Sequence, residues 1–334
     1  MTIYKLKRRN NMKFLVTGIT GFAGPHLAKL LLKEGHEVHG IIRTANGREM
    51  DLVDIMSVEE IEKIKFHYAD LKDYMGVEKV LSQNFDGVFH LAAQSHPPTS
   101  FTDPIMTWND NVTATMNIIT LLENTKTKLM FCSTSEVYGD TCDGTKLHTD
   151  GKILPANPYG ASKAAIDIYL QERFANKKLN GFVTRAFSHT GERRGKIFSI
   201  SSDAYQIAKM KLGLQDKVLK IGNLKTERVV IDVRDCVNAY YLLMMTEKSN
   251  GKVYNVCGDE IQKMQYYTDC LIKASGIPYE DIKQEIYKPY YREIDIQVQV
   301  GDSSLLKLHT GWEPKISIEK TMNDLLNYWV EKLS

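Results

Sequence analysis

The stretch KFLVTGITGFAG, residues 13–24, joins a short apolar segment to three glycines spaced three residues apart. The residues after it, 25–34, place Leu27 and Leu31 on one face of an expected helix, and Pro25 suits the first turn of that helix. Glycines at a strand-to-helix turn let the backbone approach a pyrophosphate at the helix N-terminus. The stretch therefore predicts a dinucleotide site, with a plain tight turn as the alternative. The expected contacts are Gly18, Thr20, Gly21, Phe22, Ala23 and Gly24.

Apolar and amphipathic segments continue to alternate up to residue 186. Strands are expected at residues 37–42, 65–68, 87–91, 128–132 and 181–186, and helices at 75–82, 104–124 and 157–174. This alternation predicts an α/β fold, a doubly wound parallel sheet of the Rossmann type with helices on both faces. Beyond it the composition changes, and we expect a smaller mixed α/β lobe with helices at 201–212, 233–245 and 318–333 and a strand at 253–256.

The expected division of the chain has three parts: a flexible leader at residues 1–12, a dinucleotide-binding domain at 13–186 and a substrate lobe at 187–334, some segments of which return to the sheet. The leader is polar and basic and lacks the apolar core of a secretory signal. Whether it is native stays open, because Met12 offers a second start.

The charge balance and the distribution of apolar residues exclude several classes of protein. The chain has 43 Lys and Arg residues against 41 Asp and Glu residues, which argues against a general nucleic-acid-binding protein. No apolar run reaches the ~18 residues that a membrane helix needs. The five cysteines are scattered without metal-binding spacing. We therefore expect a cytoplasmic protein with no nucleic-acid partner, no membrane partner and no metal.

Arg43 stands at the end of the second expected strand, where an acidic residue would bind the ribose hydroxyls of NAD. A guanidinium at this position suits the additional phosphate of NADP. The sequence therefore predicts NADP rather than NAD, with an ordinary solvated arginine as the alternative. Further cofactor contacts are expected at the ends of the third and fourth strands, from Asp70, Leu71, Leu91, Ala92, Ala93 and Ser95.

A polar loop follows the expected strand at residues 128–132 and contains Thr134, Ser135 and Glu136. Open α/β sheets bind ligands beyond the carboxyl ends of their strands, so this loop is where reacting groups would be placed. An ordinary strand-to-loop junction, with Thr134 capping a turn and Glu136 in solvent, is the alternative.

Tyr159 and Lys163 are four residues apart and share one face of the expected helix. An ammonium beside a phenol favours the phenolate and is expected to lower the pKa of the phenol, which would provide a base near neutral pH. Pairs with this spacing also occur by chance. Combined with the glycine-rich turn and the polar loop, the pair predicts an active site that uses Tyr159 and Lys163 next to the cofactor.

With these motifs the chain resembles the extended branch of the short-chain dehydrogenase/reductase superfamily. More narrowly, it resembles the nucleotide-sugar 4,6-dehydratases of the GDP-mannose type. The resemblance covers nearly the whole chain from residue 13 onward and depends on residues 17–24, 92–96, 134–136, 159, 163, 187–195, 292–295, 301–303 and 311–314. Within the superfamily, the Thr-x-Glu pair of Thr134 and Glu136 distinguishes dehydratases, since related reductases and epimerases lack it.

The resemblance implies a lyase that ends its cycle with the cofactor unchanged. Tyr159 would take the proton of the sugar 4-hydroxyl while hydride passes to NADP, and Lys163 would stabilise the phenolate. Thr134 would hold the oxygen at carbon 4. The ketone formed there makes the proton at carbon 5 acidic, so Glu136 would remove it and help water leave from carbon 6. The stored hydride would then return to carbon 6 and yield a 4-keto-6-deoxy sugar.

The resemblance also implies where a GDP-linked sugar would bind. A forked guanidinium suits a diphosphate, which makes Arg228 and Arg292 candidates, with surface ion pairs as the alternative. Ser188 stands where the family usually has Asn, so its contact with the substrate is an open point. The full set of expected substrate contacts is Ser95, Thr134, Ser135, Ser188, Arg193, Lys209, Arg228 and Arg292.

Departures from the family pattern keep other readings open. The loop after Arg43 is shorter than the family's arginine–serine loop, which reaches a neighbouring subunit, so we expect a homodimer through residues 104–124 and 159–174, with a tetramer as the alternative. The run 228–235 is closer to the family's 4-ketoreductases. A 4-keto-sugar reductase or epimerase is therefore the alternative enzyme, and the dehydratase substrate is either GDP-mannose or GDP-manno-heptose. A binding protein without turnover is a third possibility, against which the presence of Tyr159, Lys163 and Glu136 argues.

Overall fold

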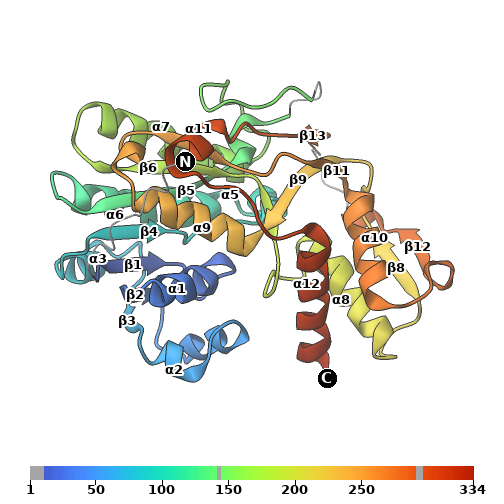
Figure 1. The fold of residues 1–334 in the computed structure, drawn as a ribbon. Helices are drawn as coiled ribbons and strands as arrows, with labels where there is room; N and C mark the ends of the chain where they lie inside the picture. The colour runs from blue at the N-terminus through green and yellow to red at the C-terminus, as the bar shows by residue number, and fades with distance from the viewer. Residues whose placement is uncertain (1–10, 141–143, 291–295) are drawn as a thin grey trace, which may run out of the picture.

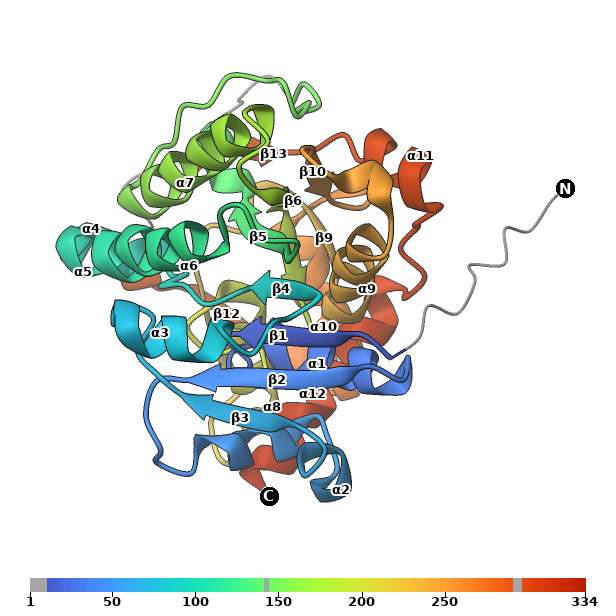
Figure 2. The same ribbon diagram turned by 90° about the vertical axis from the view of Figure 1, so that its left-hand side faces the viewer.

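Seven parallel strands form the central sheet of the computed structural model, which describes residues 11–140, 144–290 and 296–334. Their order is β10-β6-β5-β4-β1-β2-β3, and each neighbouring pair is parallel (Figure 2). The order reverses between β1 and β4, which confirms the predicted doubly wound sheet. The strands are β1 (Lys13–Thr17), β2 (Glu37–Ile42), β3 (Lys65–Tyr68), β4 (Gly87–His90), β5 (Lys128–Thr134), β6 (Asn180–Ala186) and β10 (Val253–Val256).

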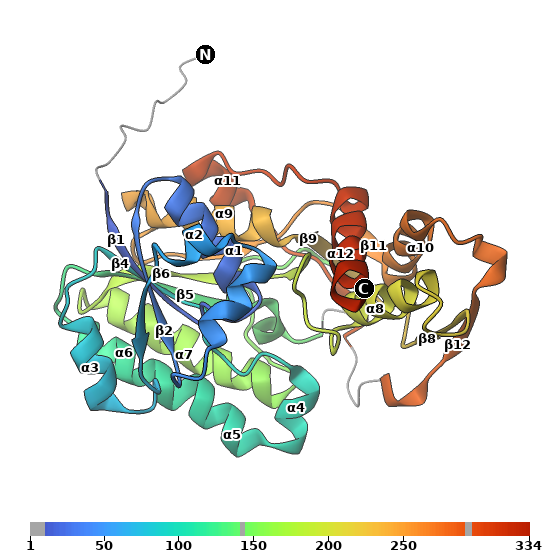
Figure 3. The ribbon, with the colours of Figure 1, turned by 90° about the horizontal axis from the view of Figure 1, so that it is seen from below.

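Successive residues of β1 enter two separate cores, because side chains alternate between the faces of a strand. Phe14 and Val16 pack in one cluster, and Leu15 packs in the other. The first cluster lies under α1 (Ala23–Lys33), α9 (Val233–Met244) and α11 (Ser304–Thr310); the second lies under α3 (Tyr74–Leu81), α6 (Ala114–Leu122) and α7 (Pro158–Ala175) (Figure 3). Burial on both faces explains the nearly continuous apolar runs of these strands.

The helix expected at residues 104–124 contains a wide turn. It comprises α5 (Pro104–Trp108), a π-helical turn (Asn109–Thr113) and α6. The wide turn buries Asn111, whose side-chain amide donates to the carbonyl oxygen of Gln94 at 3.0 Å and to the hydroxyl of Ser162 at 2.9 Å. The turn therefore ties α7 to the loop after β4, a long-range contact that periodicity along the sequence does not reveal. The part of the chain that forms the central sheet also contains two short helices, α2 (Val58–Ile61) and α4 (Pro97–Thr102).

The helices α9 and α11 and the strand β10 belong to the part built on the central sheet, whereas other segments of the second half of the chain form the lobe on the right of Figure 1. Its larger sheet contains β7 (Ser188–Thr190), β9 (Glu227–Asp232), β11 (Ile261–Lys263) and β13 (Val298–Gln299), and β8 (Val218–Ile221) pairs with β12 (Lys283–Ile286). Three helices share an apolar cluster there: α8 (Ser199–Lys211), α10 (Met264–Ser275) and α12 (Ile318–Leu333). Among the described residues, none of the helices combines the length and apolar character that crossing a bilayer requires.

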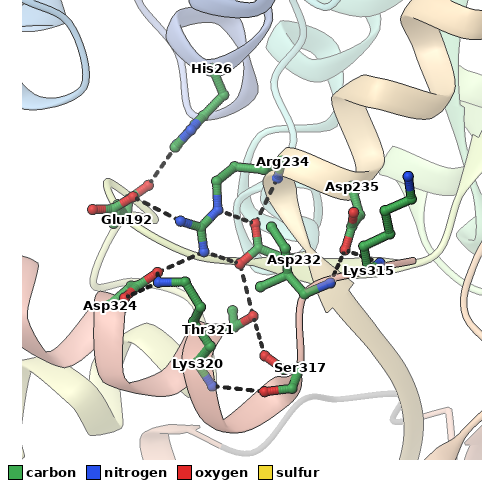
Figure 4. Close-up of polar contacts among 11 residues, drawn as sticks. His26, Glu192, Asp232, Arg234, Asp235, Lys315, Ser317, Lys320, Thr321 and Asp324 are labelled. Atoms are coloured by element: carbon green, nitrogen blue, oxygen red, sulfur yellow. Dashed lines mark hydrogen bonds and ion pairs between the residues drawn. The ribbon is translucent and has the colours of Figure 1, made fainter. Parts of the chain in front are cut away.

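A polar junction joins the lobe to the sheet (Figure 4). Arg234 in the first turn of α9 donates to both carboxylate oxygens of Asp232, at 2.8 and 2.7 Å, and to Asp324 of α12 at 2.7 Å. On the side of the sheet, the ring of His26 in α1 lies 3.1 Å from the carbonyl oxygen of Glu192. Burial lowers the pKa of His26 to about 4, so this contact is made by a neutral imidazole at physiological pH. These contacts fix the positions of α1, β9 and α12 relative to one another.

Candidate active site

One large cleft, with a volume of about 1180 Å³, opens at the carboxyl ends of the central strands. Single-ligand sites usually have volumes of ~300–1,000 Å³, so this cleft is large enough for a dinucleotide together with a second ligand. Most of the predicted site residues line it: Gly18, Thr20, Gly21, Phe22, Ala23, Gly24, Arg43, Asp70, Leu71, Leu91, Ala92, Ala93, Ser95, Thr134, Ser135, Glu136, Tyr159, Lys163, Ser188 and Arg228.

The turn between β1 and α1 forms one wall of the cleft. Gly18 has a φ of +69°, and a Cβ atom on it would lie 2.8 Å from the backbone nitrogen of Ala92. A side chain is therefore excluded where the turn passes the loop after β4. The described residues place no side-chain cap on the first turn of α1, so its amide groups are available to an anion. These features fit the pyrophosphate of a dinucleotide.

Arg43 lines the cleft at the end of β2 with a side chain that is 62% exposed. Its Nε lies 3.9 Å from a carboxylate oxygen of Asp70, and its Nη2 lies 3.6 Å from one of Asp110. Both contacts are long, and exposed ion pairs of this kind contribute ~0–1 kcal/mol. The guanidinium is therefore accessible to a phosphate group of a ligand.

The predicted catalytic loop is held to the start of α7. The hydroxyl oxygen of Thr134 accepts a hydrogen bond from the amide of Glu136 at 3.3 Å. Asn157 donates to Glu136 Oε2 at 2.7 Å and accepts from the amide of Gly160 at 2.7 Å. Asn157 thus caps the helix that carries Tyr159 and positions the carboxylate at the same time. Sequence reasoning did not include Asn157 in the site, although an Asn directly before the first proline of a helix is a capping signal.

Tyr159 and Lys163 line the cleft from one face of α7, and both side chains are buried. Burial raises the pKa of Tyr159 above its usual value of about 10. Burial also lowers the pKa of Lys163 to about 8, and its ammonium lies 4.2 Å from the centroid of the Phe131 ring. We expected the ammonium to lower the pKa of the phenol. In this structure the pKa of the phenol is raised instead, because desolvation outweighs the hydrogen bond with Thr134 and the charge of Arg194, which both lower it.

A buried ion pair lies behind the catalytic loop and was not foreseen from the sequence. Arg185 of β6 donates through Nε and Nη2 to the two carboxylate oxygens of Asp167 in α7, at 2.8 and 3.0 Å. Ser133 at the end of β5 also donates to Asp167, at 2.8 Å. The two charged side chains are 1% and 0% exposed. The pair therefore fixes β5, β6 and α7 to one another directly beneath the cleft.

Replacing Asp167 by Asn is expected to lower the free energy of unfolding by about 3–5 kcal/mol, because the charge of Arg185 is then buried without an opposite charge to balance it. Denaturant unfolding followed by circular dichroism would measure the loss. The matched control is Asp281→Asn, which breaks an ion pair with Lys217 in which the side chains are 43% and 47% exposed. That control should cost below about 1 kcal/mol. Equal losses in the two variants would contradict the role given to burial.

Two of the predicted substrate contacts lie elsewhere than expected. Lys209 of α8 does not line the cleft, and its ammonium lies 5.8 Å from the Tyr205 ring centroid. Arg193 is directed at the glycine-rich turn, where it donates to the carbonyl oxygens of Thr20, at 2.9 Å, and Gly21. These placements correct the predicted substrate contacts of Lys209 and Arg193. The position of a residue along the chain did not show which way its side chain points.

Arg194, the neighbour of Arg193, is the arginine of this pair that lines the cleft. Its guanidinium lies 3.5 Å from the centroid of the Phe198 ring and 4.7 Å from that of Phe22. Burial lowers its pKa to about 10, so it stays charged near neutral pH. The backbone of Arg193 is left-handed, with a φ of +70°, and this bend separates the directions of the two side chains.

The remaining predicted contacts lie on the lobe side of the cleft or outside the described residues. Arg228 of β9 is 9% exposed, and its guanidinium donates to the carbonyl oxygen of Glu227 at 2.8 Å. Ser135 donates to the side-chain oxygen of Gln299 at 2.8 Å. Arg292 lies outside the described residues.

Comparisons with known proteins agree with this geometry. A family model described as GDP-mannose 4,6 dehydratase matches residues 15–325. GDP-mannose 4,6 dehydratase 1 of Arabidopsis thaliana is 30% identical over 331 residues, which cover 94% of this chain and 88% of the plant protein. GDP-6-deoxy-D-mannose reductase of Pseudomonas aeruginosa is 27% identical over 324 residues, which cover 96% of this chain and 98% of the reductase.

A solved structure of a related protein has the same fold as this chain. The structure of RMD from Pseudomonas aeruginosa complexed with NADPH has a TM-score of 0.81 and 26% sequence identity to this chain, and the match covers 96% of this chain and 100% of that one. The family match includes the glycine-rich turn, the loop after β5 and the Tyr–Lys pair. The chain therefore belongs to the GDP-mannose 4,6-dehydratase family, within the extended short-chain dehydrogenases/reductases.

Proposed function

We propose that this protein is a nucleotide-sugar 4,6-dehydratase that converts GDP-mannose, or the related GDP-manno-heptose, to the 4-keto-6-deoxy sugar. The observation that supports this most is the convergence of Thr134, Glu136, Tyr159 and Lys163 on the cleft that the glycine-rich turn also lines. An elimination next to a ketone needs a carboxylate and a phenol that transfer protons within one site. In this proposal the first half of the chain binds the cofactor, and the lobe binds the sugar nucleotide.

The roles of the side chains follow from their chemistry. Tyr159, as the phenolate, takes the proton of the 4-hydroxyl, and the ammonium of Lys163 stabilises that phenolate. Thr134 holds the oxygen at carbon 4. Glu136 then takes the acidified proton at carbon 5 and protonates the hydroxyl that leaves from carbon 6. The glycine-rich turn and Arg43 would hold NADP, which would supply the hydride-transfer chemistry when bound.

A 4-keto-sugar reductase or epimerase is the alternative, and one observation favours it. The Pseudomonas aeruginosa relative named GDP-6-deoxy-D-mannose reductase matches this chain over nearly its whole length. A reductase needs Tyr159 and Lys163, but it has no use for a base at carbon 5. The placement of Glu136 beside Thr134 in the cleft therefore favours the dehydratase.

Product analysis with a limiting amount of cofactor separates the two activities. The full chain would be incubated with GDP-mannose, GDP-manno-heptose and UDP-sugars in the presence of trace NADP, and the products analysed by mass spectrometry. The dehydratase predicts the loss of one water per sugar with no net change in cofactor. NADPH consumed in proportion to a 4-keto substrate would instead establish the reductase. Turnover of none of these compounds, with NADP still bound, would favour a binding protein.

Replacing Arg43 by Ala is expected to weaken the binding of NADP about tenfold or more and to leave NAD binding nearly unchanged. A tenfold change corresponds to about 1.4 kcal/mol, within the range of one charge-assisted hydrogen bond to a phosphate. Titration calorimetry with both cofactors would measure the ratio. Arg48→Ala is the control, since Arg48 also lines the cleft but lies 3.4 Å from Asp51. An equal loss of affinity for NADP and NAD would mean that Arg43 does not read the additional phosphate.

We also propose a cytoplasmic homodimer formed by α5, α6 and α7. Exposed apolar side chains on these helices support the interface, with Ile105 74%, Trp108 47% and Ile168 53% exposed. A tetramer is the alternative assembly. Light scattering of the purified chain would distinguish dimer from tetramer, and fractionation of cells would test the compartment.

A further inference from the structure

Asp203 contributes a buried carboxylate to the lobe side of the cleft. The residue lies near the start of α8 and is 5% exposed. Its Oδ2 accepts a hydrogen bond from the hydroxyl of Thr268 in α10 at 2.8 Å, whereas its Oδ1 has no partner among the described residues. Buried carboxylates are normally paired or fully hydrogen-bonded, because burial removes the water that would solvate the charge.

The residues around Asp203 do not offset the free-energy cost of burying its charge. The helices α8 and α10 pack around an apolar cluster that includes Ala204, Ile207 and Leu271. Burial raises the pKa of Asp203 to about 7, and the hydrogen bond from Thr268 opposes this shift only in part. Such a group in the wall of a ligand cleft is explained if a ligand donates hydrogen bonds to it.

The position of Asp203 along the cleft indicates which part of a sugar nucleotide would reach it. The sugar must face Tyr159 and Glu136, at the carboxyl ends of the central strands. The diphosphate and the nucleoside must then extend toward the lobe, whose cleft-lining residues include Asp203, Gly222 and Arg228. Arg228 suits the diphosphate because its guanidinium is a fixed cation. The negative charge of Asp203 would repel a diphosphate. The nucleoside is therefore the part of the sugar nucleotide that Asp203 would bind.

We propose that Asp203 selects guanine by accepting hydrogen bonds from its N1–H and its 2-amino group, an inference that rests on the proposed function. Guanine places two donors side by side on this edge, whereas adenine, cytosine and uracil place an acceptor next to their donor. In its ionised form, which two donors of a bound base would favour, the carboxylate of Asp203 offers acceptors only, so it matches guanine and repels the other bases. Each carboxylate oxygen has two acceptor sites, so Oδ2 can keep its bond with Thr268 while the base is bound.

Calorimetry with nucleoside diphosphates tests this selection without requiring turnover. The wild-type chain should bind GDP about 10- to 100-fold more tightly than IDP, which lacks the 2-amino group, since one hydrogen bond to a charged group is lost. Asp203→Asn should weaken GDP binding and reduce the preference for GDP over IDP to within about threefold. The same variant should bind XDP, in which a carbonyl replaces the 2-amino group, better than the wild type does, because an amide can donate to that carbonyl. Asp281→Asn, at an exposed position outside the cleft, should change none of these ratios.

Several outcomes would overturn the inference. One is equal binding of GDP and IDP by the wild type, a result that needs no variant to fold. Another is an Asp203→Asn variant that retains the wild-type preference. A third is a loss of affinity for 2′-deoxy-GDP that depends on Asp203, which would place the carboxylate on the ribose instead. If the chain dehydrates a GDP-sugar and any of these holds, only the role of Asp203 fails. If it binds no guanine nucleotide and dehydrates no GDP-sugar, the proposed function fails with it.

Discussion

Glu136→Gln is expected to slow dehydration by about 10²- to 10⁴-fold, because an amide cannot accept the proton from carbon 5. The first step does not use this carboxylate, so cofactor reduction in the presence of substrate should persist. The variant should preserve the hydrogen bond that holds this side chain. Glu136 Oε2 accepts from Asn157 at 2.7 Å, and the side-chain oxygen of Gln can accept the same bond. The expected result is an enzyme that stops at the 4-keto stage with its sixth carbon still hydroxylated.

Two measurements check this expectation. Mass spectrometry of a single turnover should show little loss of water, and deuterium from heavy water should not enter carbon 5 of the bound sugar. Glu285→Gln is the control, since Glu285 is a partly exposed glutamate of β12, outside the cleft lining. Dehydration by Glu136→Gln at the wild-type rate would remove Glu136 from the mechanism, whatever the control shows.

Lys163→Ala is expected to slow the first oxidation by about 10²- to 10³-fold, because the phenolate of Tyr159 then forms in a buried site without its ammonium. The pKa of Tyr159 is already raised by burial, so the loss of this cation makes the active form rarer still. Single-turnover formation of reduced cofactor would measure the effect. Dehydration should fall in parallel, since it depends on the ketone that this step forms.

The pH dependence of the wild type gives an independent readout of Lys163. Burial lowers the pKa of this ammonium to about 8, so kcat/KM should fall as the pH rises through about 8 and the charge is lost. Lys163→Arg keeps a charge that does not titrate in this range, so its residual activity should lack this decline. Near-normal oxidation by Lys163→Ala would contradict the pairing of Tyr159 with Lys163.

Local patterns in the sequence were sufficient for the seven strands of the central sheet, but not for α10 or for the short strands of the lobe. The helix expected at residues 318–333 begins and ends at those residues in α12, because Ser317 caps its start and an apolar stripe containing Met322 and Leu325 runs along one face. The strand expected at 253–256 is β10, which returns to the central sheet beside β6. Capping and periodicity are properties of neighbouring residues, so a single sequence contains them.

Side-chain direction and burial could not be read in the same way. Arg193 and Arg194 are adjacent and chemically identical, yet one braces the glycine-rich turn and the other lines the cleft. The pKa of Tyr159 shifts opposite to the expected direction, because desolvation depends on everything that packs around the phenol. Asp203 lies within the helix expected at residues 201–212, and only the folded structure shows that it lines the cleft.

The doubly wound sheet, the glycine-rich turn and the types of reacting groups could be predicted from the sequence, since each depends on residues close together along the chain. Packing of the folded chain was needed to show which groups line the same cleft, that Asp167 pairs with Arg185, and that Asn157 holds Glu136. Asp167 and Arg185 lie on separate elements, 18 residues apart. Their contact forms only when α7 and β6 pack together. The same packing buries the pair and so makes the contact strong.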